Sequence, residues 1–88
     1  MAALKNEFNA LILLSSKEEP GVEDSLRAVL EPFTLTIEEI QRIALRGRLI
    51  LGFLITCDRA HVHAIEADLV EFGARTGFDV AIDYSETV

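Results

Sequence analysis

Two segments of the chain are almost entirely hydrophobic and predict strands. Residues 8–14 and 49–57 show no alternation between apolar and polar positions, which is typical of strands that are covered on both faces. Residues 78–84 instead alternate between apolar residues and acidic or small ones, which indicates a strand with one exposed face. We therefore expect the two apolar strands at the centre of a sheet and the mixed strands at its edges.

Two further segments show the spacing of amphipathic helices. In residues 21–32 and 59–76 the apolar residues recur mostly at intervals of three or four, so they fall on one face. These apolar residues are Val22, Leu26, Val29, Leu30 and Phe33 in the first segment and Val62, Ile65, Leu69 and Phe72 in the second. Asp58 is a good N-cap for the second helix, and Gly77 is suited to end it.

Residues 34–46 fit two patterns. Apolar and polar residues alternate at the start of the segment, which favours a strand, but Ile40 then falls on the opposite face. A strand here would therefore need a bulge or a change of face. Thr36 followed by Glu39 has the spacing of a capping box, so a helix also fits the local pattern.

The order of elements predicts the fold class. If residues 34–46 form a strand, the order is strand, helix, strand, strand, helix, strand. This is the layout of an α+β ferredoxin-like βαββαβ sandwich, in which a four-stranded antiparallel sheet carries two helices on one face. We expect a single domain over residues 8–84, with flexible ends at 1–7 and 85–88.

The composition agrees with a small folded domain and excludes several partners. Half of the 88 residues are hydrophobic, which excludes general disorder. Fifteen acidic against eight basic residues give a net charge of −7, which argues against a nucleic-acid partner. No apolar run approaches the ~20 residues of a membrane span, and the first residues lack the pattern of an export signal. Because the single cysteine, Cys57, fits a reducing compartment, we expect a cytoplasmic protein with no membrane partner.

The residues that most often carry chemistry are not arranged as a catalytic or metal site. His61 and His63 are two positions apart, whereas metal ligands on one helix are usually three or four apart. Cys57 is interpreted as a small buried residue, and the paired glutamates at 18–19 and 38–39 as solvated surface. No D-x-D-x-T, G-x-S-x-G or phosphate-binding loop motif is present. We expect no enzyme activity from this chain alone, and no metal or cofactor in it.

Basic residues are concentrated on one predicted hairpin. Arg42, Arg46 and Arg48 are three of the eight basic residues of the chain. A solvated hairpin tip is one interpretation of this cluster, and contact with an anion or a partner is the other.

Three motifs together resemble a known family. Residues 15–22 (SSKEEPGV), between a strand and an amphipathic helix, resemble the D-x-P-G-[VI] opening of an ACT domain. The hairpin 43–54 (IALRGRLILGFL) and the final strand at 77–82 (GFDVAI) are similar to the N-terminal ACT region of bacterial phosphoserine phosphatases. The resemblance covers about residues 8–84 and favours a strand at 34–46.

The resemblance implies a regulatory module that binds an amino acid and forms a homodimer. L-serine is the first candidate ligand, with glycine as an alternative, and the family's ligand lies in the loop between the first strand and the first helix. The candidate ligand-binding residues are Ser16, Lys17, Glu18, Glu19, Pro20, Gly21 and Val22. Pro20 and Gly21 match the family pattern, whereas Glu18 stands where Asp or Asn is typical. A helix N-terminus offers N–H groups to a carboxylate, and an acidic side chain near Glu18 could receive an ammonium group.

The same resemblance implies a role in an enzyme whose chemistry lies elsewhere. Phosphoserine phosphatases use a D-x-D-x-T loop and Mg²⁺ in a separate domain, and these 88 residues contain no such loop. We therefore expect the regulatory part of a phosphoserine phosphatase of L-serine biosynthesis, joined to a phosphatase domain on a full-length chain, or a free-standing relative. The alternative is a ligand-independent oligomerisation module that pairs through the edge strand at 34–46. An RNA-binding module is disfavoured, because Phe8 and Phe53 are the only aromatic residues on the predicted central strands.

Overall fold

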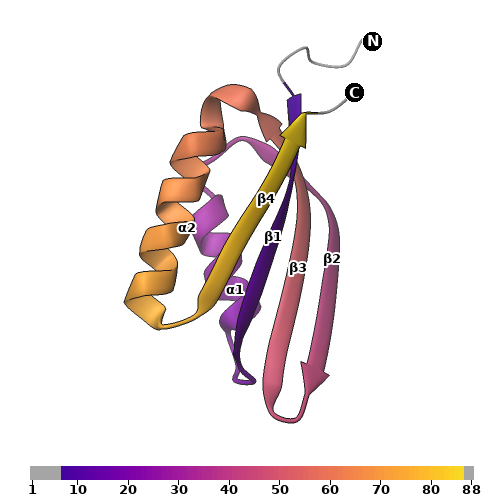
Figure 1. Cartoon of the computed structure of the whole chain (residues 1–88), viewed down its shortest axis with the longest axis vertical. Helices are drawn as coiled ribbons and strands as arrows, with labels where there is room; N and C mark the ends of the chain where they lie inside the picture. Colours follow the sequence, from indigo (N-terminus) through magenta and orange to yellow (C-terminus); the bar gives the residue numbers. More distant parts are fainter. Residues whose placement is uncertain (1–6, 87–88) are drawn as a thin grey trace.

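The computed structural model describes residues 7–86 of the chain (Figure 1). The elements, in order, are β1 (Glu7–Lys17), α1 (Val22–Leu30), β2 (Leu35–Leu45), β3 (Arg48–Asp58), a short 3-10 helix η1 (Arg59–His61), α2 (Val62–Thr76) and β4 (Asp79–Glu86). β1 begins at Glu7 and β4 extends to Glu86, so both strands are longer than predicted. The rest of the ends that we expect to be flexible lies outside the described residues.

The four strands form one antiparallel sheet in the order β2-β3-β1-β4. Both helices lie against the same face of this sheet (Figure 1). The two apolar strands, β1 and β3, occupy the central positions, and the mixed strands β2 and β4 form the edges. The predicted α+β ferredoxin-like fold is therefore confirmed. Within the described part of the chain, neither helix is long and hydrophobic enough to cross a membrane.

Within residues 34–46, β2 is a strand with a bulge, as the strand interpretation of this segment requires. The pairing of β2 with β3 shifts by one residue between Ile37 and Glu39, so Glu38 is the extra residue of a β-bulge. Because of this extra residue, Ile37 and Ile40 both pack on the helix side of the sheet. The predicted bulge is confirmed.

The first strand and the first helix end at other residues than predicted. β1 continues through residues 15–17, which the sequence indicates as a turn, because these residues pair with the start of β3 and Lys17 lies opposite Arg48. α1 ends at Leu30, two residues earlier than expected. Glu31 still has helical dihedral angles, but Pro32 has no N–H with which to continue the helical hydrogen bonds.

The second helical segment begins with η1 rather than with an α-helix. The carboxylate of Asp58 accepts the N–H of Ala60 at 2.9 Å, so Asp58 caps this 3-10 turn. The α-helical part starts at Val62 and is followed by Gly77, which has the positive φ typical of a helix end.

The hydrophobic core fills the space between the helices and the sheet. Its buried members are Ala10, Ile12, Leu14, Val22, Leu26, Leu30, Leu49, Leu51, Phe53, Ile55, Cys57, Val62, Ile65, Leu69 and Phe72. Each large aliphatic or aromatic side chain buried here contributes about 1.5–3 kcal/mol to stability. Both predicted helical stripes supply this core, although Val29 and Phe33 are only partly buried.

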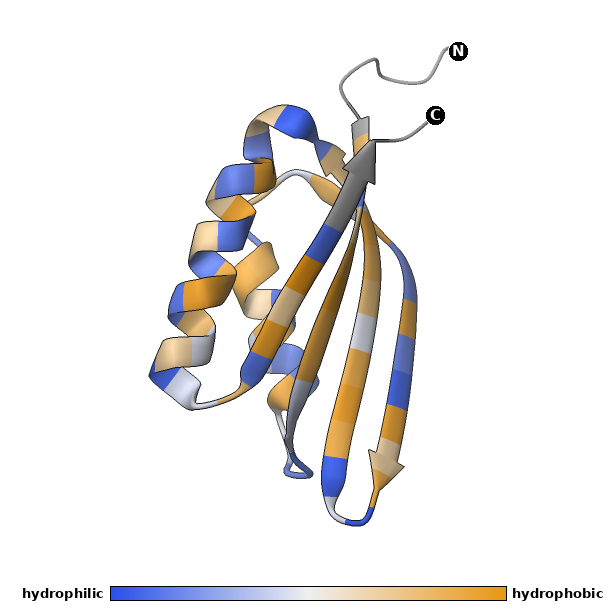
Figure 2. Cartoon of the chain, in the orientation of Figure 1, coloured by the Kyte–Doolittle hydropathy of each residue, from blue (hydrophilic) through white to orange (hydrophobic). Residues whose placement is uncertain are grey.

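No element of the described chain covers the opposite face of the sheet, which we call the outer face. Leu11, Leu13 and Ile50 lie on it and are 37%, 44% and 39% exposed. The prediction that β1 and β3 are covered on both faces is therefore wrong within this chain, because the helices lie on one side only. Figure 2 shows that β3 is hydrophobic along most of its length. By register, the hydrophobic residues of the outer face are Leu11, Leu13, Ile43, Leu45, Ile50, Leu54 and Ala81.

Candidate ligand-binding loop

Four residues connect β1 to α1 and begin the helix without a side-chain cap. Gly21 has φ 87° and ψ 0°, a left-handed conformation that L side chains rarely adopt. Its carbonyl accepts the N–H of Ser25 at 2.9 Å. The N–H groups in the first turn of a helix have no acceptor within the helix itself. In α1 no side chain caps them either. These groups form the positive end of the helix and attract an anion.

The loop is fixed to the turn between β2 and β3. The N–H of Glu18 donates to the carbonyl of Gly47 at 2.8 Å, and Lys17 lies opposite Arg48 in the sheet. The loop therefore lies beside the hairpin that carries the cluster of arginines.

A cavity of about 280 Å³ lies between the loop and β2, and we call it the Gly21 cavity. Its walls are Glu19, Pro20, Gly21, Val22, Glu23, Asp24, Arg42 and Leu49. Arg42 reaches this cavity because it lies opposite Leu51, on the helix side of β2. Among the described residues, Arg42 has no hydrogen-bond or ion-pair partner. Its guanidinium group is therefore available to an anionic ligand.

A second cavity, of about 260 Å³, lies on the other side of the loop and is called the hairpin cavity here. Its walls are Ser15, Ser16, Lys17, Glu19, Arg48, Thr76, Gly77, Phe78 and Asp79. Arg48 donates to the hydroxyl of Ser15 at 2.8 Å, and the hydroxyl of Ser16 donates to the carbonyl of Lys17 at 2.8 Å. Several polar groups of this cavity are thus already bonded to one another, unlike Arg42 in the Gly21 cavity.

The seven candidate residues from the sequence are divided between these two cavities. Pro20, Gly21 and Val22 line the Gly21 cavity, Ser16 and Lys17 line the hairpin cavity, and Glu19 lines both. Glu18 lines neither cavity, and its backbone is held by the turn between β2 and β3. The side chain of Val22 is buried in the core, so Val22 offers a ligand its backbone. Glu19 is accordingly better placed than Glu18 to receive an ammonium group.

Arg42 lines the Gly21 cavity, although no local sequence pattern predicts that it lies near the loop. The available sign was the concentration of Arg42, Arg46 and Arg48 on one hairpin, with an anion contact as one interpretation. Which of the three reaches the Gly21 cavity depends on the register of β2 and on the bulge at Glu38. A local pattern of residues does not define either.

The Gly21 cavity presents charges of both signs. Arg42 and the N-terminus of α1 are positive, whereas Glu19 and Asp24 are negative. The third carboxylate, Glu23, already pairs with Arg27 at 3.2 Å. A small zwitterion, with a carboxylate at one end and an ammonium group at the other, has the complementary arrangement. The volume lies just below the ~300 Å³ at which pockets for drug-sized molecules begin, which suits a ligand of a few heavy atoms.

The two histidines lie away from this loop. Within residues 7–86, no three His, Cys, Asp or Glu side chains are grouped closely enough to hold a metal ion. His61 packs near Phe33, with ring centroids 6.2 Å apart. His63 is exposed and lies 3.9 Å from the carboxylate of Glu66.

Cys57 is buried at the end of β3, as the sequence indicates. Burial raises the pKa of its thiol, and the neighbouring carboxylate of Asp58 raises it further. Because the thiolate is the reactive form of cysteine, a buried thiol with a raised pKa is a poor nucleophile.

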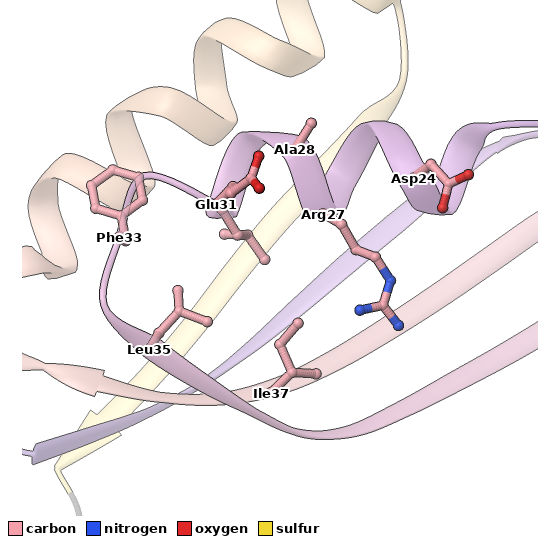
Figure 3. Close-up of a pocket in the computed structure, with 8 residues that line it drawn as sticks. Asp24, Arg27, Ala28, Glu31, Phe33, Leu35 and Ile37 are labelled. Carbon is pink, nitrogen blue, oxygen red and sulfur yellow. The ribbon is translucent and has the colours of Figure 1, made fainter.

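A cavity of about 590 Å³ lies between α1 and the first half of β2. Figure 3 shows Leu35 and Ile37 pointing from β2 toward α1, and Arg27 reaching down from the helix. Arg27 already pairs with Glu23 at 3.2 Å, and its guanidinium lies 5.8 Å from the ring of Phe53. The arginine of this cavity is already paired, and several of its walls are apolar side chains. It is therefore less suited to a small polar ligand than the Gly21 cavity is.

Comparison with known proteins gives this geometry a context. The profile of the ACT domain family matches residues 8–83. Over 82 residues the chain is 32% identical to phosphoserine phosphatase SerB2 of Mycobacterium tuberculosis, a match that covers 91% of this chain and 20% of that protein. The chain therefore spans one fifth of the length of this relative.

Solved structures share the fold at low sequence identity. A putative glycine cleavage system transcriptional repressor has a TM-score of 0.84 at 12% identity, over 93% of this chain and 48% of that one. An ACT domain protein from Streptococcus pneumoniae has a TM-score of 0.76 at 14% identity, over 88% of this chain and 89% of that one. At these identities the likeness concerns the fold alone.

Proposed function

Because the chain belongs to the ACT domain family, we propose that it is a regulatory domain that binds a small amino acid, with L-serine as the first candidate and glycine as the alternative. The observation that carries the proposal is the unpaired Arg42, which faces the uncapped N-terminus of α1 across the Gly21 cavity. Two positive groups that line the same cavity of about 280 Å³ suit the carboxylate of an amino acid.

The acidic side of the cavity suits the other end of the ligand. In the proposed complex, Glu19 accepts the ammonium group, while Gly21 allows the ligand carboxylate to approach the backbone closely. The small volume favours serine or glycine over amino acids with long side chains. The buried side chain of Val22 supports the wall of the cavity from the core.

The relative at 32% identity suggests where such a domain acts. We propose that the chain is the regulatory part of a phosphoserine phosphatase of L-serine biosynthesis in the cytoplasm, and that catalysis belongs to a separate phosphatase domain. The 88 residues contain no D-x-D-x-T motif, so the nucleophile would have to come from such a domain.

Titration calorimetry with the 88-residue chain tests the binding. L-serine or glycine should give saturable heat, and Arg42→Gln should weaken binding at least about tenfold, because a hydrogen bond to a charged group contributes roughly 1.5–3 kcal/mol. Arg46→Gln is the matched control, since Arg46 lies on the same hairpin but lines neither cavity. No heat from any amino acid would overturn the sensing role, and equal affinities for wild type and Arg42→Gln would overturn the site.

A ligand-independent assembly module is the second candidate function. It is favoured by β2, an edge strand of 11 residues that pairs on one side only, because unpaired backbone groups at a sheet edge can bind another chain. Sedimentation in the presence and absence of amino acids separates the two functions. A stable dimer that no amino acid affects would favour assembly, and a monomer at all concentrations would oppose it.

A further inference from the structure

Two basic side chains face each other at the end of the sheet where β1 and β3 meet the hairpin turn. Lys17 and Arg48 are directly opposite in the register, and both lie on the outer face, in phase with Leu13 and Ile50. Like charges that are directly opposite in a sheet destabilise it. The chain has only eight basic residues against fifteen acidic ones, so a pair of adjacent cations stands out. A bound anion would offset the repulsion between them.

The two cations line the hairpin cavity, of about 260 Å³, together with Ser15. Among the residues that the structure describes, the ammonium group of Lys17 has no hydrogen-bond or ion-pair partner. Arg48 donates to the hydroxyl of Ser15 at 2.8 Å, but a guanidinium has five N–H donors, so this bond leaves others for a ligand. The hydroxyl of Ser15 accepts this bond and keeps its own hydrogen to donate. An ammonium, a guanidinium and a hydroxyl are therefore open to one anion.

This group of donors suits a phosphate monoester better than a carboxylate. A phosphate monoester has a charge of about −1.5 to −2 near neutral pH, which offsets two cations, whereas a carboxylate offsets one. Its three terminal oxygens match the three kinds of donor. A guanidinium can bind two oxygens of a phosphate at once, and a lysine ammonium binds phosphate as a compact charge.

The same cavity contains negative groups, which disfavour a simple anion. Asp79 begins β4 and lies opposite Ser15, beside the donors. Its carboxylate has no hydrogen-bond or ion-pair partner within residues 7–86. Glu19 also lines the cavity, and α2 ends beside it at Thr76 with the negative end of its dipole. These groups repel a bare phosphate but attract a ligand that also carries a positive charge.

The spacing of the charges defines the ligand further. Ser15 and Asp79 lie on neighbouring strands, which are ~4.8 Å apart. Because Arg48 reaches Ser15, the cations and the carboxylate are separated by about the width of one strand. A phosphate and an ammonium group that are joined by two carbon atoms span a similar distance.

We propose that the hairpin cavity is a second ligand site, which binds a phosphate monoester that carries an ammonium group two carbon atoms away. In this complex Lys17, Arg48 and the hydroxyl of Ser15 bind the phosphate. Asp79 accepts the ammonium group. The site thus uses Lys17, a residue of the predicted loop that does not line the Gly21 cavity, and one arginine of the basic hairpin.

This proposal goes beyond amino-acid binding and needs neither Arg42 nor the Gly21 cavity. One consequence does rest on the proposed function. Hydrolysis of a phosphate ester of serine by a phosphatase domain consumes water and releases free serine and inorganic phosphate. The ester and the free amino acid would then bind on two sides of one loop. The domain would respond separately to the substrate and to the product of the same reaction.

Titration calorimetry of the 88-residue chain in phosphate-free buffer tests the site. The main probe is 2-aminoethyl phosphate, because it lacks the carboxylate that the Gly21 cavity is proposed to bind. It should give saturable heat, and Lys17→Gln and Arg48→Gln should each weaken its binding at least about tenfold, as expected for a hydrogen bond to a charged group. Arg46→Gln is the matched control and should bind like the wild type, since Arg46 lies on the same hairpin but does not line the cavity.

A second pair of measurements separates specific binding from a general attraction of charge. Ethyl phosphate, which has no ammonium group, should bind more weakly than 2-aminoethyl phosphate. Asp79→Asn should weaken the binding of 2-aminoethyl phosphate and tighten that of ethyl phosphate, because it removes both the partner of the ammonium group and a repulsion of the phosphate. A general effect of charge would instead tighten the binding of both ligands and would contradict the proposal. Lys17→Gln should be at least as stable as the wild type in urea, because it relieves the repulsion with Arg48.

Four results would overturn the proposal. The first is the absence of saturable heat from 2-aminoethyl phosphate up to about 10 mM, a concentration at which even very weak binding is detected. The second is an equal affinity of the wild type, Lys17→Gln and Arg48→Gln, and the third is an equally weakened affinity of Arg46→Gln. The fourth is displacement of the probe by L-serine, which would mean a shared site. A chain that binds the probe but not serine would support this site and contradict the serine site alone.

Discussion

The N–H of Glu18 donates a 2.8 Å hydrogen bond to the carbonyl of Gly47, which ties the loop before α1 to the turn between β2 and β3. The two residues are far apart in sequence, and the bond extends the pairing of Lys17 with Arg48 by one step. It holds the backbone of the loop while the side chains of Glu19 and Pro20 stay exposed. The proposed ligand would therefore meet a loop whose position is already set, so less binding energy would be spent on ordering it.

Gly21→Ala should destabilise the domain through the backbone alone. No atom lies within 4 Å of a Cβ placed on Gly21, but its φ of 87° is strained for any L side chain, at a cost of about 1–2 kcal/mol. Urea denaturation at one protein concentration measures this loss. Gly52→Ala is the control, because its new Cβ would lie at an ordinary 3.7 Å from Leu13, and it should cause no loss. Equal stabilities for the two variants would contradict the backbone argument.

Leu26→Ala should cost far more stability than a change at an exposed aliphatic residue. Leu26 is fully buried between α1 and the sheet, and removing a buried leucine side chain typically costs about 2–5 kcal/mol. Val70→Ala, at a site that is 68% exposed, should change the free energy of unfolding by less than ~0.5 kcal/mol. A small effect at Leu26 would mean that the core relaxes around the missing side chain.

Cys57 should make stability fall as the pH rises above 9. Burial, and to a smaller extent Asp58, raises the pKa of this thiol from its ordinary value of 9.0. The unfolded chain therefore loses the proton first, so the contribution is fully present below pH 9 and is lost as the pH rises through the higher pKa of the folded state. Urea denaturation between pH 8 and pH 10.5 should show a flatter pH dependence for Cys57→Ala than for the wild type. Identical slopes would contradict the assignment, and the thiol should also react faster with a disulfide reagent once the chain is unfolded.

The order and the central positions of the strands could be predicted because they follow from local composition. Residues 8–14 and 49–57 are apolar on both sides, and the central places of the sheet are the ones that need such strands. The bulge could also be predicted, since Ile40 interrupts the alternation of β2 and no regular strand could place Ile37 and Ile40 on one face.

The extent of β1 and the members of the site depend on pairing that a local pattern does not contain. Residues 15–17 are polar and read as a turn, yet β3 supplies partners for them, so they form strand. Likewise, Arg42 meets the Gly21 loop only through the register of β2. The open side of the sheet cannot be predicted for a related reason. The pattern of a strand indicates that both of its faces are apolar, but it does not indicate whether anything covers each face.

The extra residue at Glu38 has a consequence for both surfaces of β2. In a strand of the same sequence without the bulge, side chains would continue to alternate, and Arg42 would point to the outer face while Ile43 pointed toward the helices. The cavity would lose its unpaired cation, and a charge would stand in the middle of an apolar surface. One inserted residue thus sets the phase of seven others, and with it places the cation of the Gly21 cavity on one side of the strand and the exposed hydrophobic residues of the outer face on the other.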